Sequence, residues 1–208
     1  MEIIPAILTR SRDEITERLT SLAGLDLTVQ IDFMDGQFVP SRSLPPDDLP
    51  DELALASWEA HLMVQEPVAW SQPLYTRGVK RLYWHVEALP ADAIIPHHHS
   101  DVEHGLALML DTPIEVLEPF LSMAQSVLLM SIEDPGYQGE LFVESVYAKI
   151  KALKKKHPHI KVAVDGGVKM EHLKPLSILG VDRVTVGSAF WKFGDPKTVL
   201  AAFRQATL

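Results

Sequence analysis

The segment KVAVDGGVKMEHLKPLSILGVDRVTVGS, residues 161–188, reads as a strand, a helix and a second strand. An apolar run ends at Asp165 and two glycines, a helical pattern follows over Lys169–Leu179, and a second β-branched run ends at Gly187 and Ser188. Strands that alternate with helices in this way favour parallel neighbours joined by right-handed crossovers. The segment therefore predicts one unit of an α/β protein with a parallel sheet.

The same alternation of apolar runs and helical patterns extends over the rest of the chain. Six more strand-like runs precede residue 161: EIIPAIL, LTVQIDFM, SWEAHLMV, RLYWHVEA, GLALML and SVLLMSI. The other helical patterns are clearest over Arg12–Ala23, Pro67–Arg77, Ile114–Ala124, Gly139–Lys156 and Lys197–Ala206. Eight such units predict a (β/α)8 barrel, the TIM barrel, as one domain over residues 1–208. An open doubly wound sheet is the alternative fold.

The chain is short for a TIM barrel. It has 208 residues, whereas the fold typically has about 250. The segment Leu89–His104, LPADAIIPHHHSDVEH, is interrupted by prolines, so we expect a loop there in place of a full helix. Its three adjacent histidines, His97–His99, cannot all face one ion, and we interpret them as part of a solvated loop.

Composition and charge exclude several classes of function. Hydrophobic residues make up 47% of the chain and charged residues 23%, a mix typical of globular proteins. The formal net charge of -9 disfavours nucleic acids and anionic membranes as partners. There are no cysteines, which excludes disulfides, thiolate nucleophiles and cysteine-ligated zinc. The N-terminus has an early acid and no basic region, unlike a signal peptide, and we expect a cytoplasmic protein.

Two carboxylates at predicted strand ends are the candidate acid and base. Catalytic residues of a TIM barrel lie at the carboxyl ends of its strands. Asp32 ends the second strand and Asp165 the seventh, so the two face each other across the barrel mouth. Carboxylates on opposite sides of one substrate carbon can remove a proton from one face and return one to the other.

His61, at the end of the third predicted strand, is a candidate metal ligand. A single histidine at a strand end is usually a hydrogen-bonded structural residue, and we interpret His85 in that way. His61 differs because Asp32 and Asp165 point into the same mouth, and one histidine with two aspartates forms a plausible divalent-metal site. Such an ion would stabilise an enediolate oxygen.

Glycine pairs after the last two strands indicate a phosphate site. Gly166 with Gly167, and Gly187 with Ser188, follow the seventh and eighth strands, where TIM barrels commonly bind phosphate. Tight turns that require glycine are the alternative explanation. Weaker candidates near the mouth are the glycines of the loop after the sixth strand, and methionines that form either core or apolar walls: Gly136, Gly139, Met34, Met63 and Met130.

The chain resembles ribulose-phosphate 3-epimerases in the order of its motifs. IPAILT, IDFMDGQFVP, HLMV, WHVEA, LLMSIEDPGYQGELF, VAVDGGV and VGSAF follow one another as they do in that family, from near residue 3 to near residue 191. The resemblance implies a TIM barrel, usually oligomeric. It also implies an isomerase of carbohydrate metabolism, in the pentose phosphate pathway, that interconverts D-ribulose 5-phosphate and D-xylulose 5-phosphate through a metal-stabilised enediolate.

The resemblance also assigns roles to individual residues. It implies that Asp32 and Asp165 exchange the C3 proton and that both, with His61, bind a divalent ion of zinc, manganese, iron or magnesium. Asp35 then belongs to the turn after the second strand. The remaining matches are the methionines over the substrate and the phosphate loops: Met34, Met63, Met130, Gly136, Gly139, Gly166, Gly167, Gly187 and Ser188.

Several positions depart from the family pattern. Gln30 stands where the family has a fourth metal-binding histidine, and its carbonyl is a poorer ligand than imidazole for zinc-like ions. Ala6 replaces a serine near the substrate, and Gln138 replaces a phosphate-loop glycine. Met109-Leu110 stands in place of an Asn-Pro pair, and the sixth-strand loop has an extra acid at Glu133-Asp134. We therefore keep Gln30 as a candidate ligand.

These departures leave two alternatives to the ribulose-phosphate reaction. One is an epimerase for a different ketose phosphate, which the retained pair of aspartates allows. The other is a divergent, non-catalytic relative that keeps the barrel and binds a sugar phosphate, for which the altered ligands are the motive. In all three cases we expect a sugar phosphate as the small-molecule partner and a homo-oligomer as the assembly.

Overall fold

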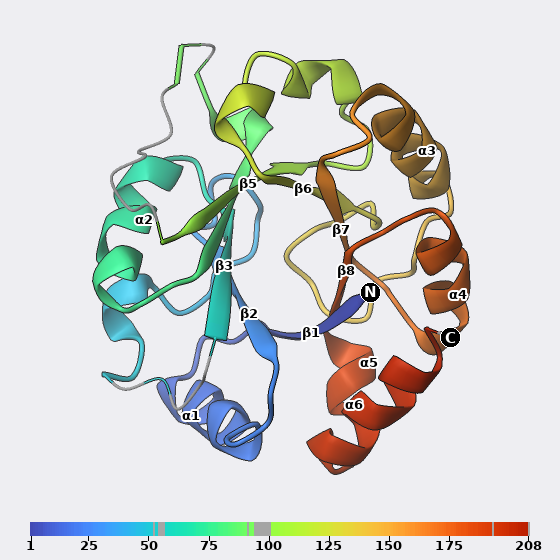
Figure 1. Ribbon diagram of the computed structural model, residues 1–208. Coiled ribbons are helices and arrows are strands. Elements are labelled where there is room, and N and C mark those ends of the chain that lie inside the picture. Colours follow the sequence, from blue (N-terminus) through green and yellow to red (C-terminus); the bar gives the residue numbers. More distant parts are fainter. Residues whose placement is uncertain (52, 54–56, 91, 94–100, 193, 208) are drawn as a thin grey trace.

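Eight parallel strands form a closed barrel in chain order, with β8 paired to β1 (Figure 1). The structure is a computed structural model that describes residues 1–51, 53, 57–90, 92–93, 101–192 and 194–207. The strands are β1 Glu2–Ile7, β2 Thr28–Met34, β3 Ser57–Met63, β4 Arg81–His85, β5 Glu103–Leu108, β6 Ser126–Met130, β7 Lys161–Asp165 and β8 Arg183–Val186. The predicted (β/α)8 fold is confirmed. The open-sheet alternative is wrong because the β1–β8 pairing closes the sheet.

Helices cover the barrel unevenly. The α-helices are α1 Arg12–Ser21, α2 Pro67–Thr76, α3 Val146–Lys156, α4 Met170–Ile178, α5 Ser188–Trp191 and α6 Pro196–Gln205. Short 3-10 turns stand in other connections: η1 Pro46–Asp48, η2 Val86–Ala88, η3 Ile114–Leu117 and η4 Leu121–Met123. In the described part of the chain, the β2–β3, β4–β5 and β5–β6 connections contain 3-10 turns and no α-helix. These trimmed connections explain how a short chain closes an eight-stranded barrel.

Two predicted helices differ from the structure. The helix expected over Ile114–Ala124 is instead the pair of 3-10 turns η3 and η4, because Pro119 lacks an N–H and its ring clashes with the preceding helical turn. The helix expected from Gly139 begins only at Val146, since the preceding residues form a loop at the barrel mouth. The expected loop over Leu89–His104 shows no α-helix in its described residues, and His97–His99 lie outside them.

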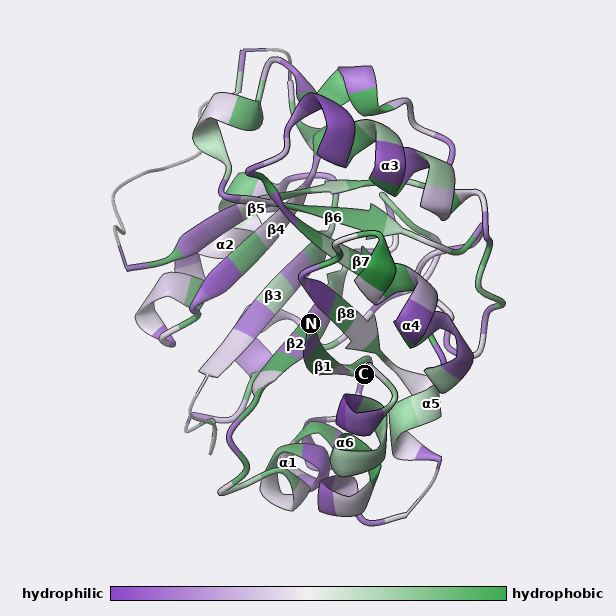
Figure 2. Ribbon diagram, turned by 45° about the vertical axis from the view of Figure 1, so that its right-hand side comes forward, coloured by the Kyte–Doolittle hydropathy of each residue, from purple (hydrophilic) through white to green (hydrophobic). Residues whose placement is uncertain are grey.

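Local sequence explains where the outer helices begin and which face they bury. The Ser11 hydroxyl accepts the Glu14 N–H at the start of α1, and the Asp195 carboxylate accepts the Thr198 N–H at the start of α6. In Figure 2, helices α3, α4 and α6 carry hydrophilic and hydrophobic segments side by side, as expected for helices that bury one face. No helix in the described residues is long and apolar enough to cross a bilayer.

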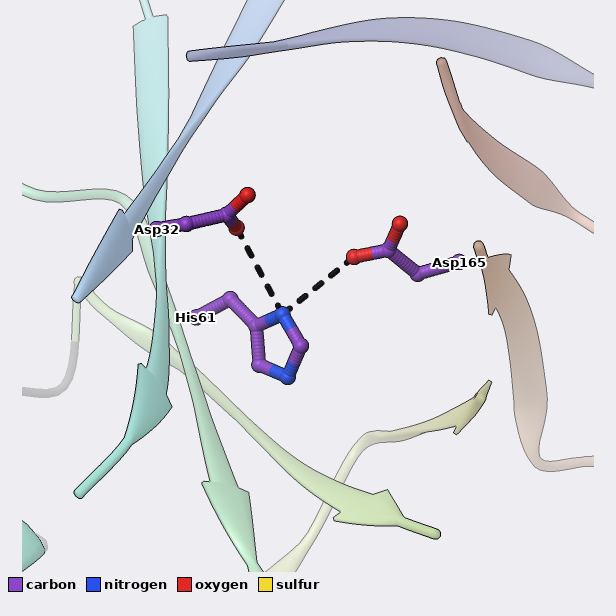
Figure 3. Close-up of side chains that lie close together, drawn as sticks. All are labelled: Asp32, His61 and Asp165. Atoms are coloured by element: carbon purple, nitrogen blue, oxygen red, sulfur yellow. Dashed lines mark ion pairs between the residues drawn. The ribbon is translucent and has the colours of Figure 1, made fainter. Parts of the chain in front are cut away.

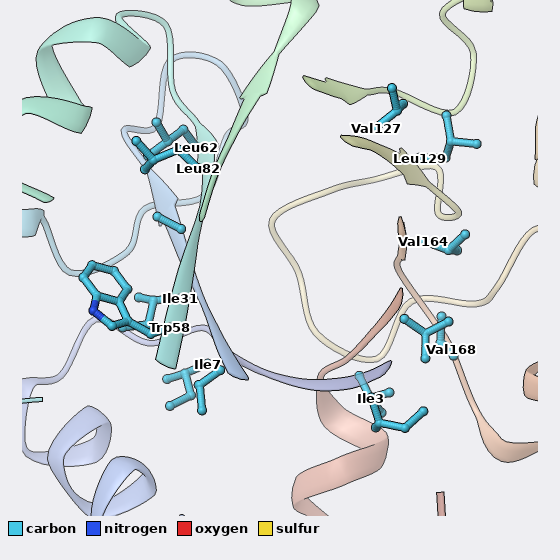
Figure 4. Close-up of a cluster of buried hydrophobic side chains, with 14 of the residues drawn as sticks. Ile3, Ile7, Ile31, Trp58, Leu62, Leu82, Val127, Leu129, Val164 and Val168 are labelled. Carbon is cyan, nitrogen blue, oxygen red and sulfur yellow. The ribbon is translucent and has the colours of Figure 1, made fainter. Parts of the chain in front are cut away.

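Alternation along the strands separates two buried layers. Side chains such as Ile31, Leu62 and Val164 point outward and pack under the helices in one large apolar cluster (Figure 4). The residues between them point into the barrel. Near the amino ends of the strands, the interior is filled by an apolar group around Tyr83 and by ion pairs. Near the carboxyl ends, the inward positions are polar, and they form the site described next.

Candidate active site

Asp32, His61 and Asp165 converge inside the carboxyl end of the barrel. Asp32 lies near the end of β2 beside His61 on β3, and the two are direct partners in the strand register. Asp165 ends β7 on another side of the barrel. The His61 Nδ1 lies 3.5 Å from Asp32 Oδ1 and 3.2 Å from Asp165 Oδ2 (Figure 3). The predicted acids and histidine therefore face one another.

The amide of Gln30 lies between the two carboxylates. Its Nε2 donates to Asp32 Oδ1 and to Asp165 Oδ2, each at 2.7 Å. Its Oε1 accepts the hydroxyl of Thr185 at 2.9 Å. This orientation is the one that chemistry favours, because the reverse would place the amide oxygen against two carboxylate oxygens. The amide nitrogen of Gln30, and not its oxygen, thus faces the acids.

A second row of hydrogen bonds supports His61 from behind. Its Nε2 lies 2.9 Å from Nε2 of His85, and the Nδ1 of His85 lies 3.1 Å from Oε2 of Glu87. The other oxygen of Glu87 accepts the N–H of Met109 at 2.8 Å. Both imidazoles are fully buried. The row fixes the ring of His61 with Nδ1 directed at Asp32 and Asp165.

Burial and neighbouring charges shift the protonation of this group in the absence of a cation. Burial is the main cause that raises the pKa of Asp32; the hydrogen bond with His61 opposes it, and the charge of Asp165 adds to it. Burial alone would lower the pKa of His61, but hydrogen bonds to Asp165 and Asp32 raise it to about 9. Burial lowers the pKa of His85 to about 4. His61 is then the protonated ring, and His85 is its neutral acceptor.

The Asp-His-Asp group has the chemistry of a divalent-metal site. One ligand atom from each of Asp32, His61 and Asp165 lies within 4.8 Å of the others. Once deprotonated, Nδ1 of His61 offers a lone pair while Nε2 donates to His85, the supporting hydrogen bond that metal-bound histidines usually make. These three residues fit a metal. Gln30 offers its amide nitrogen, which is not a ligand, so its predicted role as a ligand stays a prediction.

A cavity of about 510 Å³ opens above this group. The predicted residues that line it are Asp32, Met63, Met130, Gly136, Gly139, Asp165, Gly166, Gly167, Gly187 and Ser188. His61 and Met34 are not among its lining residues, and both are buried. Met34 packs with Val39 and Met63, and its sulfur lies under Gly136. The cavity therefore brings the predicted phosphate loops and the acid pair to one space.

The glycines of the two expected phosphate loops differ in how much room their surroundings leave for a side chain. Gly167 has a φ of 63°, and a Cβ there would collide with the main chain of Phe142. Glycine is thus required at this position by backbone and packing alone. Around Gly187 a Cβ would meet nothing within 4 Å, so space is left open beside Ser188. The tight-turn explanation accounts for Gly167, open space surrounds Gly187, and phosphate binding at the two loops stays a prediction.

Sequence reasoning missed several residues of the site. Thr185 orients Gln30 and alternates along β8 with the outward-facing Val184 and Val186. That alternation in the sequence predicts that Thr185 points into the barrel. Lys169 and Lys192 add positive charge to the cavity lining, and Tyr137 and Met170 add an apolar rim. Both lysines follow the glycine loops, but only the folded structure shows that they border the same cavity.

The departures from the family pattern also have places in the structure. Ala6 lines the cavity, and its carbonyl accepts the indole N–H of Trp191 at 2.7 Å. Gln138 lies in the loop after β6, and its Nε2 donates to the carbonyl of Leu8 at the end of β1, at 3.2 Å. This contact ties the loop across the barrel mouth.

Asp35 has the turn role expected for it. Its carboxylate accepts the N–H groups of Gln37 at 2.8 Å, Phe38 at 3.0 Å and Gln65 at 2.7 Å. Burial opposes ionisation, but these backbone hydrogen bonds lower the pKa of Asp35. The side chain therefore fixes the turn after β2, and Asp32 is left as the acid that faces the cavity.

Comparisons with known proteins find ribulose-phosphate 3-epimerases as relatives of this chain. The profile of the Ribulose-phosphate 3 epimerase family matches residues 2–191. The chain is 28% identical to a ribulose-phosphate 3-epimerase from Mycobacterium leprae, covering 98% of this chain and 93% of that protein. It is 30% identical to one from Schizosaccharomyces pombe, covering 86% of this chain and 82% of that protein.

Solved structures share the fold at low identity. The 3-hexulose-6-phosphate synthase from Salmonella typhimurium superposes with a TM-score of 0.71 at 15% identity, covering 100% of this chain and 98% of that one. KGPDC from Streptococcus mutans, solved in complex with D-R5P, gives a TM-score of 0.71 at 14% identity, covering 99% and 96%. At this identity the likeness concerns the barrel alone.

Proposed function

This chain belongs to the ribulose-phosphate 3-epimerase family, a family of enzymes, and on that premise we propose that it epimerises a phosphorylated ketose at C3. The proposed reaction interconverts D-ribulose 5-phosphate and D-xylulose 5-phosphate. The observation that carries the proposal is the pair Asp32 and Asp165, on β2 and β7, which share one amide donor and border one cavity. Each acid reaches the cavity from a different strand.

The two acids divide the proton transfer between the faces of C3. One carboxylate removes the C3 proton, which leaves an enediolate, and the other carboxyl returns a proton to the opposite face. Burial, which raises the pKa of Asp32, makes its carboxylate a stronger base toward the C3 proton. Met63 and Met130 form apolar walls of the cavity and exclude water beside the reacting carbon.

Three residues of the site suit a divalent ion. Asp32, His61 and Asp165 would hold it, and when bound it would supply positive charge close to the oxygen that becomes negative in the enediolate. His85 and Glu87 would keep His61 in the tautomer that this requires. We propose zinc, manganese, iron or magnesium as the ion.

The phosphate end of the substrate is assigned to the glycine loops. Gly166, Gly167, Gly187 and Ser188 border the cavity, and backbone N–H groups of glycine loops are suited to phosphate oxygens. Lys169 and Lys192 are among the residues that line the same cavity, and their positive charges favour an anionic ligand in a chain of net negative charge.

The proposal extends to the cellular setting. We place the protein in the cytoplasm as a homo-oligomer with one catalytic domain per chain. The cytoplasmic isoform of a rice ribulose-phosphate 3-epimerase is 27% identical and covers 86% of this chain, which supports the location. Size-exclusion chromatography with light scattering measures the assembly directly.

Exchange of the C3 hydrogen tests the reaction. The protein, first treated with chelator and then supplied in turn with Zn²⁺, Mn²⁺, Fe²⁺ or Mg²⁺, is incubated with D-ribulose 5-phosphate in heavy water and followed by NMR. We expect deuterium at C3 and the appearance of D-xylulose 5-phosphate. In the variants Asp32→Asn and Asp165→Asn, the rate of C3 exchange should fall by a factor of about 10²–10⁴. Asp13→Asn, on the exposed face of α1, is the matched control.

A second candidate is an epimerase for a different ketose phosphate. Ala6 places a methyl group in the cavity lining where the family has a hydroxyl, which changes the polar contacts offered to the sugar. The same exchange assay with a panel of ketose phosphates separates the two candidates. Exchange with another ketose alone would replace the substrate, and a folded protein that exchanges none would be a non-catalytic binding protein.

A further inference from the structure

Gln30 occupies the position from which a cation would contact the three candidate ligands. Its Nε2 lies 2.7 Å from Asp32 Oδ1, 2.7 Å from Asp165 Oδ2 and 3.5 Å from His61 Nδ1. These are atoms of the Asp-His-Asp group that could hold a metal. The amide group is fully buried. The neutral amide nitrogen therefore contacts the same ligand atoms that a divalent ion would contact.

Thr185 fixes the amide in this orientation. Its hydroxyl donates to Gln30 Oε1 at 2.9 Å, and its side chain is buried on β8. Turning the amide so that its oxygen faced Asp32 and Asp165 would break two hydrogen bonds to charged groups and would bring three oxygens together. Contacts at both ends of the amide therefore favour the orientation in which Nε2 donates to the carboxylates. A side chain positioned to bind a metal would instead direct its Oε1 at the site.

We propose that Gln30 is a competitor of the cation and not its fourth ligand. The amide holds Asp32 and Asp165 together when no cation is bound, and a cation enters only by displacing the amide from both carboxylates. Gln30, clamped by Thr185, is thus a residue that weakens cation binding and makes the ion readily exchangeable. The inference rests on the proposed function only where it assigns a divalent cation to the Asp-His-Asp group.

Removing the amide should raise the affinity for a cation, whereas removing a ligand would lower it. In Gln30→Leu the three donor atoms remain, and the two carboxylates lose the hydrogen bonds that a cation must break. Hydrogen bonds to charged groups are strong enough that we expect Mn²⁺ and Zn²⁺ to bind roughly tenfold more tightly, or better. If Gln30 were a ligand, the same variant would bind them more weakly.

Thr185 provides an independent test that leaves Gln30 in place. Thr185→Val removes the hydroxyl that holds Oε1, so the amide is released to turn or withdraw, and cation binding should again tighten, by a smaller factor. Thr185→Ser keeps the hydroxyl and should leave the affinity unchanged. Gln30→His, which supplies an imidazole, should bind Zn²⁺ more tightly than the natural chain.

The experiment is calorimetric titration of chelator-treated protein with Mn²⁺ and with Zn²⁺, without substrate. Circular dichroism checks that each variant is folded, and Thr185→Val remains informative if Gln30→Leu does not fold. Weaker binding to Gln30→Leu or to Thr185→Val would overturn the proposal. Absence of binding to every variant would overturn it as well, because a site freed of its competitor should bind. C3 exchange is measured separately. It reports on the proposed reaction and does not depend on whether cation affinity rises or falls in these variants.

Discussion

Ser131 holds the main chain of Asp165 in place. The N–H of Ser131 donates to the carbonyl of Asp165 at 2.7 Å, and its hydroxyl lies 3.0 Å from the same carbonyl and 2.6 Å from that of Gly166. Ser131 is fully buried where β6 ends. The end of β6 thereby fixes the end of β7, and with it the direction in which the Asp165 carboxylate points.

Replacing the Ser131 hydroxyl should therefore affect both stability and catalysis. In Ser131→Ala the carbonyl of Gly166 loses its buried donor, and we expect the free energy of unfolding to fall by about 1–2 kcal/mol. We also expect kcat to fall, because Asp165 is less firmly placed. Urea unfolding and initial rates measure the two effects. An unchanged kcat in a destabilised variant would mean that Ser131 supports only the fold.

His85 should control cation binding without touching the cation. It accepts from His61 and hydrogen-bonds to Glu87, and loss of such a supporting partner typically costs about 10–100-fold in metal affinity. We expect that loss in His85→Leu, measured by titration with Zn²⁺. His159→Leu, on the exposed surface, is the matched control. Equal affinities in the two variants would show that the ring of His61 needs no support.

Glu103 makes stability depend on pH at the other end of the barrel. Burial alone would raise its pKa, but the hydrogen bonds from Arg183 and the charge of Arg81 lower it to about 2. A carboxylate whose pKa is lowered by folding stabilises the protein above its unfolded pKa of about 4.5. That contribution is lost as the pH falls from there toward about 2.

The variant Glu103→Gln should remove this dependence. At neutral pH we expect it to lower the free energy of unfolding by about 2–3 kcal/mol, because Arg183 loses the partly buried carboxylate with which it is paired. The difference from the natural chain should shrink as the pH approaches 2. Urea unfolding across the acid range measures it, and a difference that stayed constant with pH would contradict the assignment.

Gly167 should be intolerant of any side chain. Gly167→Ala places a Cβ against the main chain of Phe142 at a φ of 63°, so we expect a loss of more than about 2 kcal/mol in stability and a higher KM. Gly24→Ala is matched for conformation, with a φ of 77°, but its Cβ would meet nothing within 4 Å. It should cost only about 1–2 kcal/mol. Equal losses would mean that contact with Phe142 has no effect.

The fold was predictable because its signal repeats along the chain. Each strand carries a short apolar run, and eight runs alternate with helical patterns or turns, so errors in single elements do not change the predicted architecture. The helix expected at Ile114–Ala124 does not form, because Pro119 interrupts a segment whose hydrophobic spacing suits a helix. The helix expected from Gly139 failed because that loop is shaped by contacts at the mouth, which lie elsewhere in the chain.

The site was predictable only in part for a related reason. Positions at strand ends identified Asp32, His61 and Asp165, since the carboxyl ends of parallel strands meet in space. The direction of the Gln30 amide could not be predicted, because Thr185 sets it from a strand that is distant in the sequence. The placement of Lys192 beside the same cavity likewise depends on the closure of the barrel.

The hydrogen bond from Gln138 to Leu8 constrains its two residues unequally. Its acceptor is a main-chain carbonyl, so the identity of residue 8 does not matter to the contact, whereas the identity of residue 138 does. Mutations at Leu8, which lines the cavity, can resize the entrance while the loop stays fastened. Selection, natural or in the laboratory, thus has one position at which it can explore new substrates and a neighbouring one at which it cannot.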